Sequence, residues 1–451
     1  MSTISNLIKK QPIYIKKLYY NIFPFRYRYH KVFRQTYDFL NKSQYWSTDK
    51  LNSYQMGKLS HLLLHSYNNV PYYKNLFDKL KMHPTDIKNI HDLSKIPILT
   101  KDLIKKNAKM LIATNFNKSK LLKFQTSGST GEKFEFFGTD EMYKKEAAFV
   151  LRAFHSHGAT MYNQSSIWLR RYSPNNDKSL WYYDYELKRL YMSPFHINKD
   201  TIKVYLSKMN SINASTLVGY PSSIYILACY IEELGLKLNN VKYIHVASEK
   251  ILPEWKEKIE SVLNIQVKAH YGQMEKVSFF YQTEFSDNYT EALEYGVTQF
   301  EKDPETSEST IIATGFLNYA MPFIRYQMND TAVLNYTNSE FGLPETVIDF
   351  NGRSDDILTT IKGSKIPGVN FYTMMYNIPG VMMFQLVQVS RELINVIIVP
   401  DKKYFSDETN AVIKNGIKVR MGSIKVKITI VDEILRSKKT GKIKCIINEI
   451  Q

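Results

Sequence analysis

Residues 123–133 read Lys-Phe-Gln-Thr-Ser-Gly-Ser-Thr-Gly-Glu-Lys, and the interpretation of the whole chain starts from this stretch. Its hydroxyl side chains are interleaved with two glycines. Because glycine has no Cβ, the backbone can approach a ligand closely, and successive N–H groups and hydroxyls can converge on one anion. The stretch therefore predicts a loop that binds a phosphate chain, formed by Thr126, Ser127, Gly128, Ser129, Thr130 and Gly131.

This loop differs from the P-loop of the Walker type. That motif needs about four residues between its glycines and then Gly-Lys-Ser/Thr, whereas only two residues separate Gly128 from Gly131. The alternative is a flexible Ser/Gly loop that binds nothing, and the composition of the stretch on its own favours this alternative. The segments further along the chain decide between the two.

Length and composition are those of a globular protein with more than one domain. The chain has 451 residues, of which 44% are hydrophobic and 23% charged. No apolar run approaches the roughly 18 residues of a membrane helix, and no signal-peptide pattern opens the chain. Cys229 and Cys445 stand outside any ligand-spaced cluster, which argues against disulfide scaffolds, zinc sites and thiol catalysis. We expect a cytoplasmic protein.

The net charge of +17 raises the question of a nucleic-acid or membrane partner. The lysines are spread along the chain, so we expect no nucleic acid. The N-terminal segment is an exception, because every charged residue before Asp38 is basic and these residues alternate with Ile, Leu, Phe and Tyr. Such a segment can lie on the inner, anionic face of a membrane. The favoured alternative is a helix packed on its own domain with a solvated basic face.

The first half of the chain is predicted to be helical. Residues 41–110 contain amphipathic runs that are interrupted at Pro71 and Pro97, and a further helix is expected from Glu141 to His157, where Gly158 ends it. The middle of the chain alternates helices with short apolar strands, predicted at 243–247 and 265–269. Strand, helix and strand with polar loops at the carboxyl ends are typical of an open α/β sheet, which binds its ligands at those loops.

Beyond Gly352 the pattern changes. Strands are predicted at 381–389, 392–399, 424–431 and 443–447, and a helix at 407–415. These elements predict a small α+β module of about 100 residues, which is large enough to fold separately. A basic turn, residues 437–442, precedes the last predicted strand.

Five segments resemble, in the same order, the motifs of the adenylate-forming ligases, which include acyl-CoA synthetases and adenylation domains. Each is a weak signal alone, and their joint order is a strong one. They are residues 126–131, 271–275 (Tyr-Gly-Gln-Met-Glu), 324–330 (Ile-Arg-Tyr-Gln-Met-Asn-Asp), 352–356 (Gly-Arg-Ser-Asp-Asp) and 441–442 (Gly-Lys).

Further segments narrow the resemblance to the phenylacetate–CoA ligase family, and within it to the CapK-like group associated with capsule and surface-polysaccharide gene clusters. They are residues 69–73, 219–222, 318–322 and 384–388. The fold that this resemblance implies is α/β, with a large acyl-CoA-synthetase-like domain, a helical N-terminal extension and a small mobile α+β C-terminal domain. The expected domains are a helical extension at 1–110, a nucleotide- and acyl-binding domain at 111–353, and a lid at 354–451 that carries a catalytic lysine.

The resemblance also implies roles for single residues. The 126–131 loop holds the β- and γ-phosphates of ATP, and Glu275 binds Mg²⁺, a hard cation that prefers carboxylate and phosphate oxygens. Lys442 places a compact charge between the substrate carboxylate and the α-phosphate, and Asp355 is the hinge of the lid. The remaining residues contact the adenine and the ribose: Ser248, Glu249, Tyr271, Gly272, Asp330 and Arg353.

The implied function is an ATP-dependent ligase. It activates a small-molecule carboxylate as an acyl-adenylate, releases pyrophosphate and transfers the acyl group to CoA or to an amine or hydroxyl of a glycan precursor. The alternative is a non-catalytic relative that binds nucleotide and acts as a scaffold in a membrane-associated polysaccharide assembly. Two departures from the family pattern motivate it: Asn329 stands where the family has Gly, and Glu132 follows the loop where a Lys-Pro pair is common.

Overall fold

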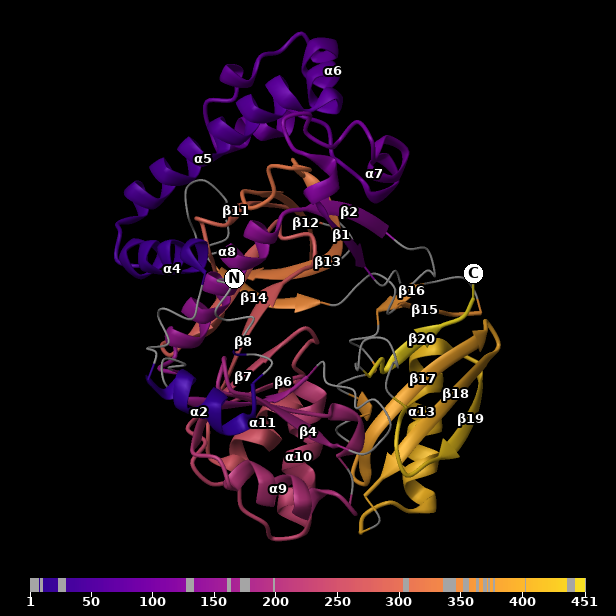
Figure 1. The fold of residues 1–451 in the computed structure, drawn as a ribbon. Helices are drawn as coiled ribbons and strands as arrows, with labels where there is room; N and C mark the ends of the chain where they lie inside the picture. Colours follow the sequence, from indigo (N-terminus) through magenta and orange to yellow (C-terminus); the bar gives the residue numbers. More distant parts are fainter. Residues whose placement is uncertain are drawn as a thin grey trace. The chain divides into compact units, whose positions relative to one another are not determined.

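A computed structural model of the chain carries the elements labelled in Figure 1. The structure describes residues 8, 11–22, 30–126, 134–159, 164–170, 179–197, 199–302, 308–335, 346–351, 357–361, 365–367, 371, 374–375, 378–401, 403–435 and 443–450. Within these residues, no helix has both the length and the apolar character that crossing a membrane requires.

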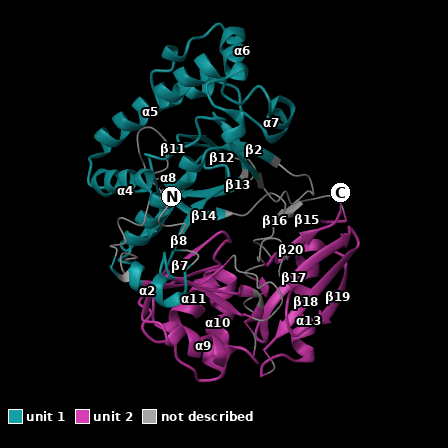
Figure 2. Ribbon diagram, in the orientation of Figure 1, with its two compact units in different colours: residues 1–164, 185–188, 268–350 teal, residues 165–184, 189–267, 351–451 magenta. Residues whose placement is uncertain are grey.

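The chain forms two compact units, coloured separately in Figure 2. Unit 1 comprises residues 1–164, 185–188 and 268–350, and unit 2 comprises residues 165–184, 189–267 and 351–451. Each unit is therefore built from segments that are far apart in the sequence. The predicted division at residues 110 and 353 stays a prediction.

The helices of unit 1 come mainly from its N-terminal part: α2 (Ile13–Ile22), α4 (Lys31–Ser43), α5 (Thr48–Asn69), α6 (Pro71–Leu80), α7 (Lys101–Asn107) and α8 (Asp140–His155). Polar side chains cap the N-termini of two of these helices. The Ser47 hydroxyl accepts a hydrogen bond from the Lys50 N–H at the start of α5, and Thr139 does the same for the Met142 N–H at the start of α8. Gly158, with φ 85°, follows the last helical residues of α8, as predicted.

The strands of unit 1 form a hairpin and a larger sheet. The hairpin pairs β1 (Leu122–Thr126) with β2 (Phe134–Gly138), and Thr126 lies opposite Phe134. In the larger sheet the order is β11-β12-β13-β14-β10-β9-β8. The bounds of these strands are β8 (Val267–Gly272), β9 (Phe279–Thr283), β10 (Ser286–Glu291), β11 (Gly296–Lys302), β12 (Glu308–Gly315), β13 (Tyr326–Asn335) and β14 (Thr346–Asn351).

Unit 1 contains a buried ion pair that joins three segments. The Arg152 guanidinium on α8 donates to both carboxylate oxygens of Glu294, at 2.7 and 3.2 Å. The hydroxyl of Ser43, the last residue of α4, donates to the same carboxylate at 2.5 Å. Only 2% of Arg152 and 6% of Glu294 are exposed. Because a buried charge is costly unless it is paired, these contacts hold α4, α8 and the turn before β11 in one arrangement.

Unit 2 contains an α/β layer and a C-terminal module. Its strands β3 (Ser165–Leu169), β6 (Ala214–Gly219) and β7 (Tyr243–Ala247) are parallel neighbours, so their carboxyl ends share one edge. The rest of this layer is β4 (Trp181–Asp184), β5 (Arg189–Met192), α9 (Ile202–Asn210), α10 (Pro221–Glu233) and α11 (Pro253–Leu263). Pro221 is the first residue of α10, where its missing N–H costs nothing.

The C-terminal module is α+β, as predicted. Its sheet has the order β19-β18-β17-β20. The elements are β15 (Ile357–Thr359), β16 (Lys365–Pro367), β17 (Val381–Ser390), β18 (Leu393–Pro400), α13 (Asp407–Met421), β19 (Lys425–Ile430) and β20 (Ile446–Asn448). A reciprocal capping pair, Ser406 and Thr409, starts α13. Gln388 of β17 donates to the Thr359 carbonyl and accepts from the Thr359 N–H, so β15 is attached to this sheet.

Candidate functional site

In unit 1, two of the predicted site residues meet although they are far apart in the sequence. Tyr271, near the carboxyl end of β8, donates its hydroxyl hydrogen to Asp330 Oδ2 on β13 at 2.7 Å. The Tyr271 ring stacks on Phe350 of β14, with ring centroids 3.9 Å apart. Burial and the nearby Asp330 carboxylate raise the pKa of Tyr271 well above its ordinary value, so the phenol stays a hydrogen-bond donor.

Glu275, the predicted magnesium ligand, lies in the same unit. It is buried and accepts a hydrogen bond from the Tyr326 hydroxyl at 3.1 Å. Burial raises the pKa of its carboxyl, and the neighbouring Asp330 charge acts in the same direction. A cation would relieve this repulsion, because both carboxylates gain from a positive charge beside them.

The next residue, Lys276, forms an ion pair with Glu146 of α8 at 2.5 Å. Lys276 adopts φ 57°, in the left-handed region, so the chain turns sharply directly after Glu275. The ion pair ties this turn to α8 and limits how far the Glu275 backbone can move.

In unit 2, the carboxyl ends of the three parallel strands carry a second group of polar side chains. Ser248 follows β7 with φ 75°, a strained backbone for a residue with a side chain. Its hydroxyl accepts a hydrogen bond from Arg170, which follows β3, at 3.2 Å. The Arg170 guanidinium also lies 5.9 Å from the centre of the Trp168 ring and 5.8 Å from that of Tyr220.

Glu249, beside Ser248, contacts the first turn of α10. Its Oε2 accepts a hydrogen bond from the Ser222 N–H at 3.2 Å, as suits a carboxylate at the positive end of a helix. Its Oε1 is buried, and within the described part of the chain it has no hydrogen-bond partner. Because buried polar atoms are normally hydrogen-bonded, this oxygen can accept a hydrogen bond from a donor group of a ligand.

Comparisons with known proteins show what this chain is similar to. A model of the CapK C-terminal domain matches residues 358–449. The sequence is 26% identical to Protein CapK of Staphylococcus aureus over 371 residues, which cover 79% of this chain and 80% of the relative. The chain therefore resembles CapK over most of its length, and the likeness includes the CapK C-terminal domain.

Two further comparisons point to CoA ligases. A 61-residue segment, 14% of each chain, is 39% identical to the phenylacetate-coenzyme A ligase of Escherichia coli K12. The crystal structure of 2-hydroxyisobutyryl-CoA ligase in the postadenylation state, in complex with R3-HIB-AMP, matches with a TM-score of 0.68 and 14% identity. That match covers 89% of this chain and 90% of the ligase. The predicted adenylate-forming resemblance and the acyl-CoA-synthetase-like fold class are confirmed.

The structure brings together only part of the predicted CapK-like site. In unit 1 it places Tyr271, Gly272, Glu275 and Asp330, and in unit 2 it places Ser248 and Glu249. Thr126 ends β1, so the hairpin leads directly into the predicted phosphate loop. That both groups contact one nucleotide stays a prediction. The other predicted site residues lie outside the described residues: Ser127, Gly128, Ser129, Thr130, Gly131, Arg353, Asp355 and Lys442.

Sequence reasoning missed two residues that complete these groups, Phe350 and Arg170, and it quoted Tyr326 within the 324–330 motif without giving it a role. Phe350 is an apolar residue of β14, and no local signal distinguishes it from an ordinary core position. Arg170 did carry a signal, because it directly follows a buried strand, where an α/β sheet binds its ligands.

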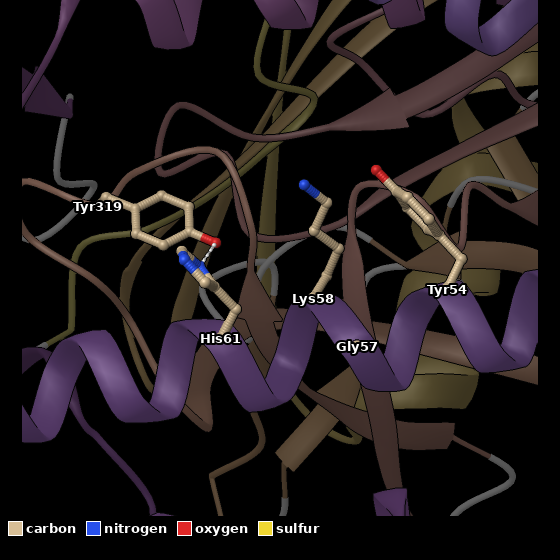
Figure 3. Close-up of a pocket in the computed structure, with 5 residues that line it drawn as sticks. All are labelled: Tyr54, Gly57, Lys58, His61 and Tyr319. Carbon is tan, nitrogen blue, oxygen red and sulfur yellow. Dashed lines mark hydrogen bonds between the residues drawn. The ribbon is translucent and has the colours of Figure 1, made fainter.

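A pocket of about 510 Å³ lies on α5, away from the groups above in the sequence. Figure 3 shows Tyr54, Lys58 and His61 on one side of the helix, with Gly57 between them and Tyr319 facing His61. Tyr319 belongs to the 318–322 segment that resembles the phenylacetate–CoA ligase family. The other lining residues belong to no predicted motif.

Proposed function

We propose that the protein is an AMP-forming ligase that activates a carboxylic acid as an acyl-adenylate. The observation that carries this proposal is the Tyr271–Asp330 hydrogen bond at 2.7 Å. It joins residues of two family motifs that are 59 positions apart in the sequence. Glu275 lies close enough to Asp330 for its charge to help raise the pKa of the Glu275 carboxyl. The chain-wide likeness to a CoA ligase structure supports the same proposal at the level of the fold.

The proposed roles follow from the chemistry of ATP. The Asp330 carboxylate accepts from a ribose hydroxyl, and Tyr271 holds this carboxylate from the other side. The buried Glu249 oxygen accepts from the amino group of adenine. The loop 126–131 binds the terminal phosphates through its N–H groups and hydroxyls. Arg353 pairs with Asp330 at the ribose, as the family resemblance implies.

Glu275 fits a magnesium site that the nucleotide completes. Among the described residues, no group of three or more His, Cys, Asp and Glu side chains is arranged to hold a metal ion. Mg²⁺ in nucleotide sites needs only one or two carboxylates, because phosphates and water supply the other ligands. The ion, when bound, neutralises charge on the phosphates. Tyr326 orients the Glu275 carboxylate for this contact.

The proposed reaction has two steps. An oxygen of the substrate carboxylate attacks the α-phosphorus of ATP, the bond to the bridging oxygen breaks, and pyrophosphate leaves. The two reacting groups are both anionic, so positive charge and positioning lower the barrier. A thiol, amine or hydroxyl then attacks the acyl carbon, loses its proton to solvent and releases AMP. We propose CoA or a glycan precursor as the acceptor, in surface-polysaccharide biosynthesis, on the strength of the CapK resemblance.

Carboxylate-dependent exchange of pyrophosphate into ATP tests the first step. The acid panel contains aryl, fatty, amino, hydroxy and dicarboxylic acids, because Arg170 and Ser248 offer polar contacts beside two aromatic rings. We expect exchange with one class. Asp330→Ala is expected to weaken ATP binding about ten- to hundredfold, the cost of removing hydrogen bonds to a charged group.

Asp78→Ala on α6 is the control, because Asp78 is an exposed carboxylate whose partners are Lys74 and Tyr67. It should leave both ATP binding and exchange unchanged. ATP binding without exchange across the whole panel would contradict the ligase proposal and favour the non-catalytic scaffold.

We further propose that α2 rests on an anionic membrane surface. Tyr14, Leu18 and Ile22 are spaced by four residues on one face of this helix, and 72%, 64% and 68% of these residues are exposed. Lys16 and Lys17 flank them in the sequence. Exposed apolar side chains beside lysines are typical of helices that lie in the interface of anionic lipids.

Co-sedimentation with phosphatidylcholine vesicles, with and without phosphatidylglycerol, checks this placement. We expect binding only to the anionic vesicles, and we expect Leu18→Glu to remove most of it. Leu435→Glu, which adds the same charge at another exposed leucine, serves as the matched control. Equal sedimentation of the Leu18→Glu variant and the native protein would rule the placement out.

A further inference from the structure

The pocket on α5 gathers hydrogen-bond donors on one face of a helix. Tyr54, Lys58 and His61 follow one another at spacings of four and three residues, so their side chains project to the same side. Tyr319, in the loop after β12, lines the pocket beside His61 (Figure 3). The volume, about 510 Å³, is within the usual range for small-molecule sites.

The α5 pocket favours negative charge. No acidic side chain lines it, and within the described residues no carboxylate pairs with the Lys58 ammonium, whose one ring contact is Tyr54, at 5.5 Å. Burial and repulsion from Lys145 lower the pKa of Lys58. Both effects disfavour an isolated cation at this place, and a bound anion would offset both.

His61 can contribute a second donor. Its Nδ1 lies 3.1 Å from the Tyr319 hydroxyl. When Tyr319 donates to Nδ1, the proton of the neutral ring is on Nε2, which can then donate to a ligand. His65, one turn further along α5, donates from Nε2 to the Tyr319 carbonyl at 2.9 Å and holds this loop residue in place.

Gly57 keeps the floor of the pocket open. A glycine inside a helix costs about 0.5–1 kcal/mol relative to alanine. Its φ is not among the positive values, and a Cβ added here would meet no atom within 4 Å. Neither backbone conformation nor close packing therefore requires glycine at this position. What its missing side chain provides is space between Tyr54 and His61.

We propose that the α5 pocket binds the phosphate monoester of a sugar. Lys58 and His61 hold the phosphate, and the Tyr54 and Tyr319 rings flank the sugar, whose C–H faces pack against aromatic surfaces. Charged hydrogen bonds to phosphate are the strong ones among protein contacts, and the aromatic walls add apolar area around them. This inference is independent of the proposed ligase reaction, because the pocket shares no residue with the groups assigned to ATP.

Isothermal titration calorimetry on the full chain without ATP tests the inference. The probes are inorganic phosphate, glucose 1-phosphate and uridine 5′-monophosphate. We expect glucose 1-phosphate to bind most tightly. Lys58→Gln should weaken its binding about ten- to hundredfold, and Gly57→Leu, which fills the floor, should remove it. Thermal unfolding of both variants, measured in parallel, shows whether they fold.

Two variants on the same helix are the controls. Lys50→Gln removes a lysine that also contacts an aromatic ring, Trp46, at 4.2 Å but lies outside the pocket, and Asn52→Leu adds a leucine at an exposed position. Both should bind glucose 1-phosphate as the native protein does. Glucose 1-phosphate binding that is unaffected by Lys58→Gln and Gly57→Leu, or weaker than about 1 mM in the native protein, would overturn the site. Tighter binding of phosphate alone or of the nucleotide would overturn the sugar assignment.

Discussion

Replacing Lys442 with alanine is expected to reduce carboxylate-dependent ATP–pyrophosphate exchange about 100-fold or more, while ATP binding and the fold persist. In the proposed reaction a carboxylate approaches the α-phosphate, and the two anions repel each other. A compact ammonium between them stabilises the transition state more than it stabilises either bound reactant, so its removal lowers the rate and spares binding.

The chain supplies its own matched controls for this variant. Lys438 and Lys439 belong to the same predicted basic turn, and Lys442 stands one residue before the described stretch 443–450. Lys438→Ala and Lys439→Ala change the same net charge, so any loss that is specific to Lys442 reflects its position. Full exchange activity in Lys442→Ala would remove the catalytic assignment.

The second half-reaction makes the Lys442 test sharper. If Lys442 acts only in adenylation, a chemically prepared acyl-adenylate should still transfer its acyl group to the acceptor in the variant. Equal loss of both half-reactions would instead indicate that Lys442 has a structural role. The thermal unfolding of the variant, compared with that of Lys439→Ala, separates these outcomes.

Local structure was predictable where a local cause dominates. The strand at 243–247 has the predicted bounds, and the C-terminal module has the predicted order of strands around its helix. Pro221 starts α10 because of its own ring geometry, which no distant residue needs to supply. The strand predicted at 265–269 begins at Val267 and continues to Gly272, because pairing with β9 extends it.

Contacts between distant segments were not predictable in the same way. The family resemblance assigned Tyr271 and Asp330 to one nucleotide, but their direct hydrogen bond depends on the order in which β8 to β14 pair. Periodicity gives the buried face of a strand and carries no information about which strand lies beside it. The contact between Tyr319 and α5 was unpredictable for the same reason, because 258 positions separate Tyr319 from His61.

The Arg152–Glu294 pair is another such contact, and its disruption has the largest expected effect on stability. Arg152→Met is expected to lower the free energy of unfolding by about 3–5 kcal/mol, because it leaves the Glu294 carboxylate buried without its counter-charge. Chemical denaturation of the native protein and the variant at pH 7 measures this difference. The double variant Arg152→Met/Glu294→Leu should recover most of the loss, since it buries no charge.

An exposed ion pair of the same length provides the control for Arg152→Met. Lys258 and Glu232 are also 2.7 Å apart, but solvent reaches both side chains. Lys258→Met should therefore change the free energy of unfolding by less than about 1 kcal/mol. If both variants lost the same amount, burial would not be the cause, and the account of the pair would be wrong.

The pH dependence of stability follows from the same contacts. Burial alone would raise the pKa of the Glu294 carboxyl, but Arg152 and the hydrogen bonds from Arg152 and Ser43 outweigh it and hold that pKa below its ordinary value. In the native protein this carboxyl therefore stabilises the fold above its unfolded pKa, and the contribution is lost as the pH falls through the lower, folded pKa. In Arg152→Met the dominant effect on Glu294 is burial, which raises the pKa of its carboxyl. Protonation then removes the unpaired buried charge, so the variant loses less stability at low pH. The stability difference between the two proteins should thus narrow as the pH falls from 7 toward about 4, and a difference that stays constant over this range would show that Glu294 is not the group left unpaired.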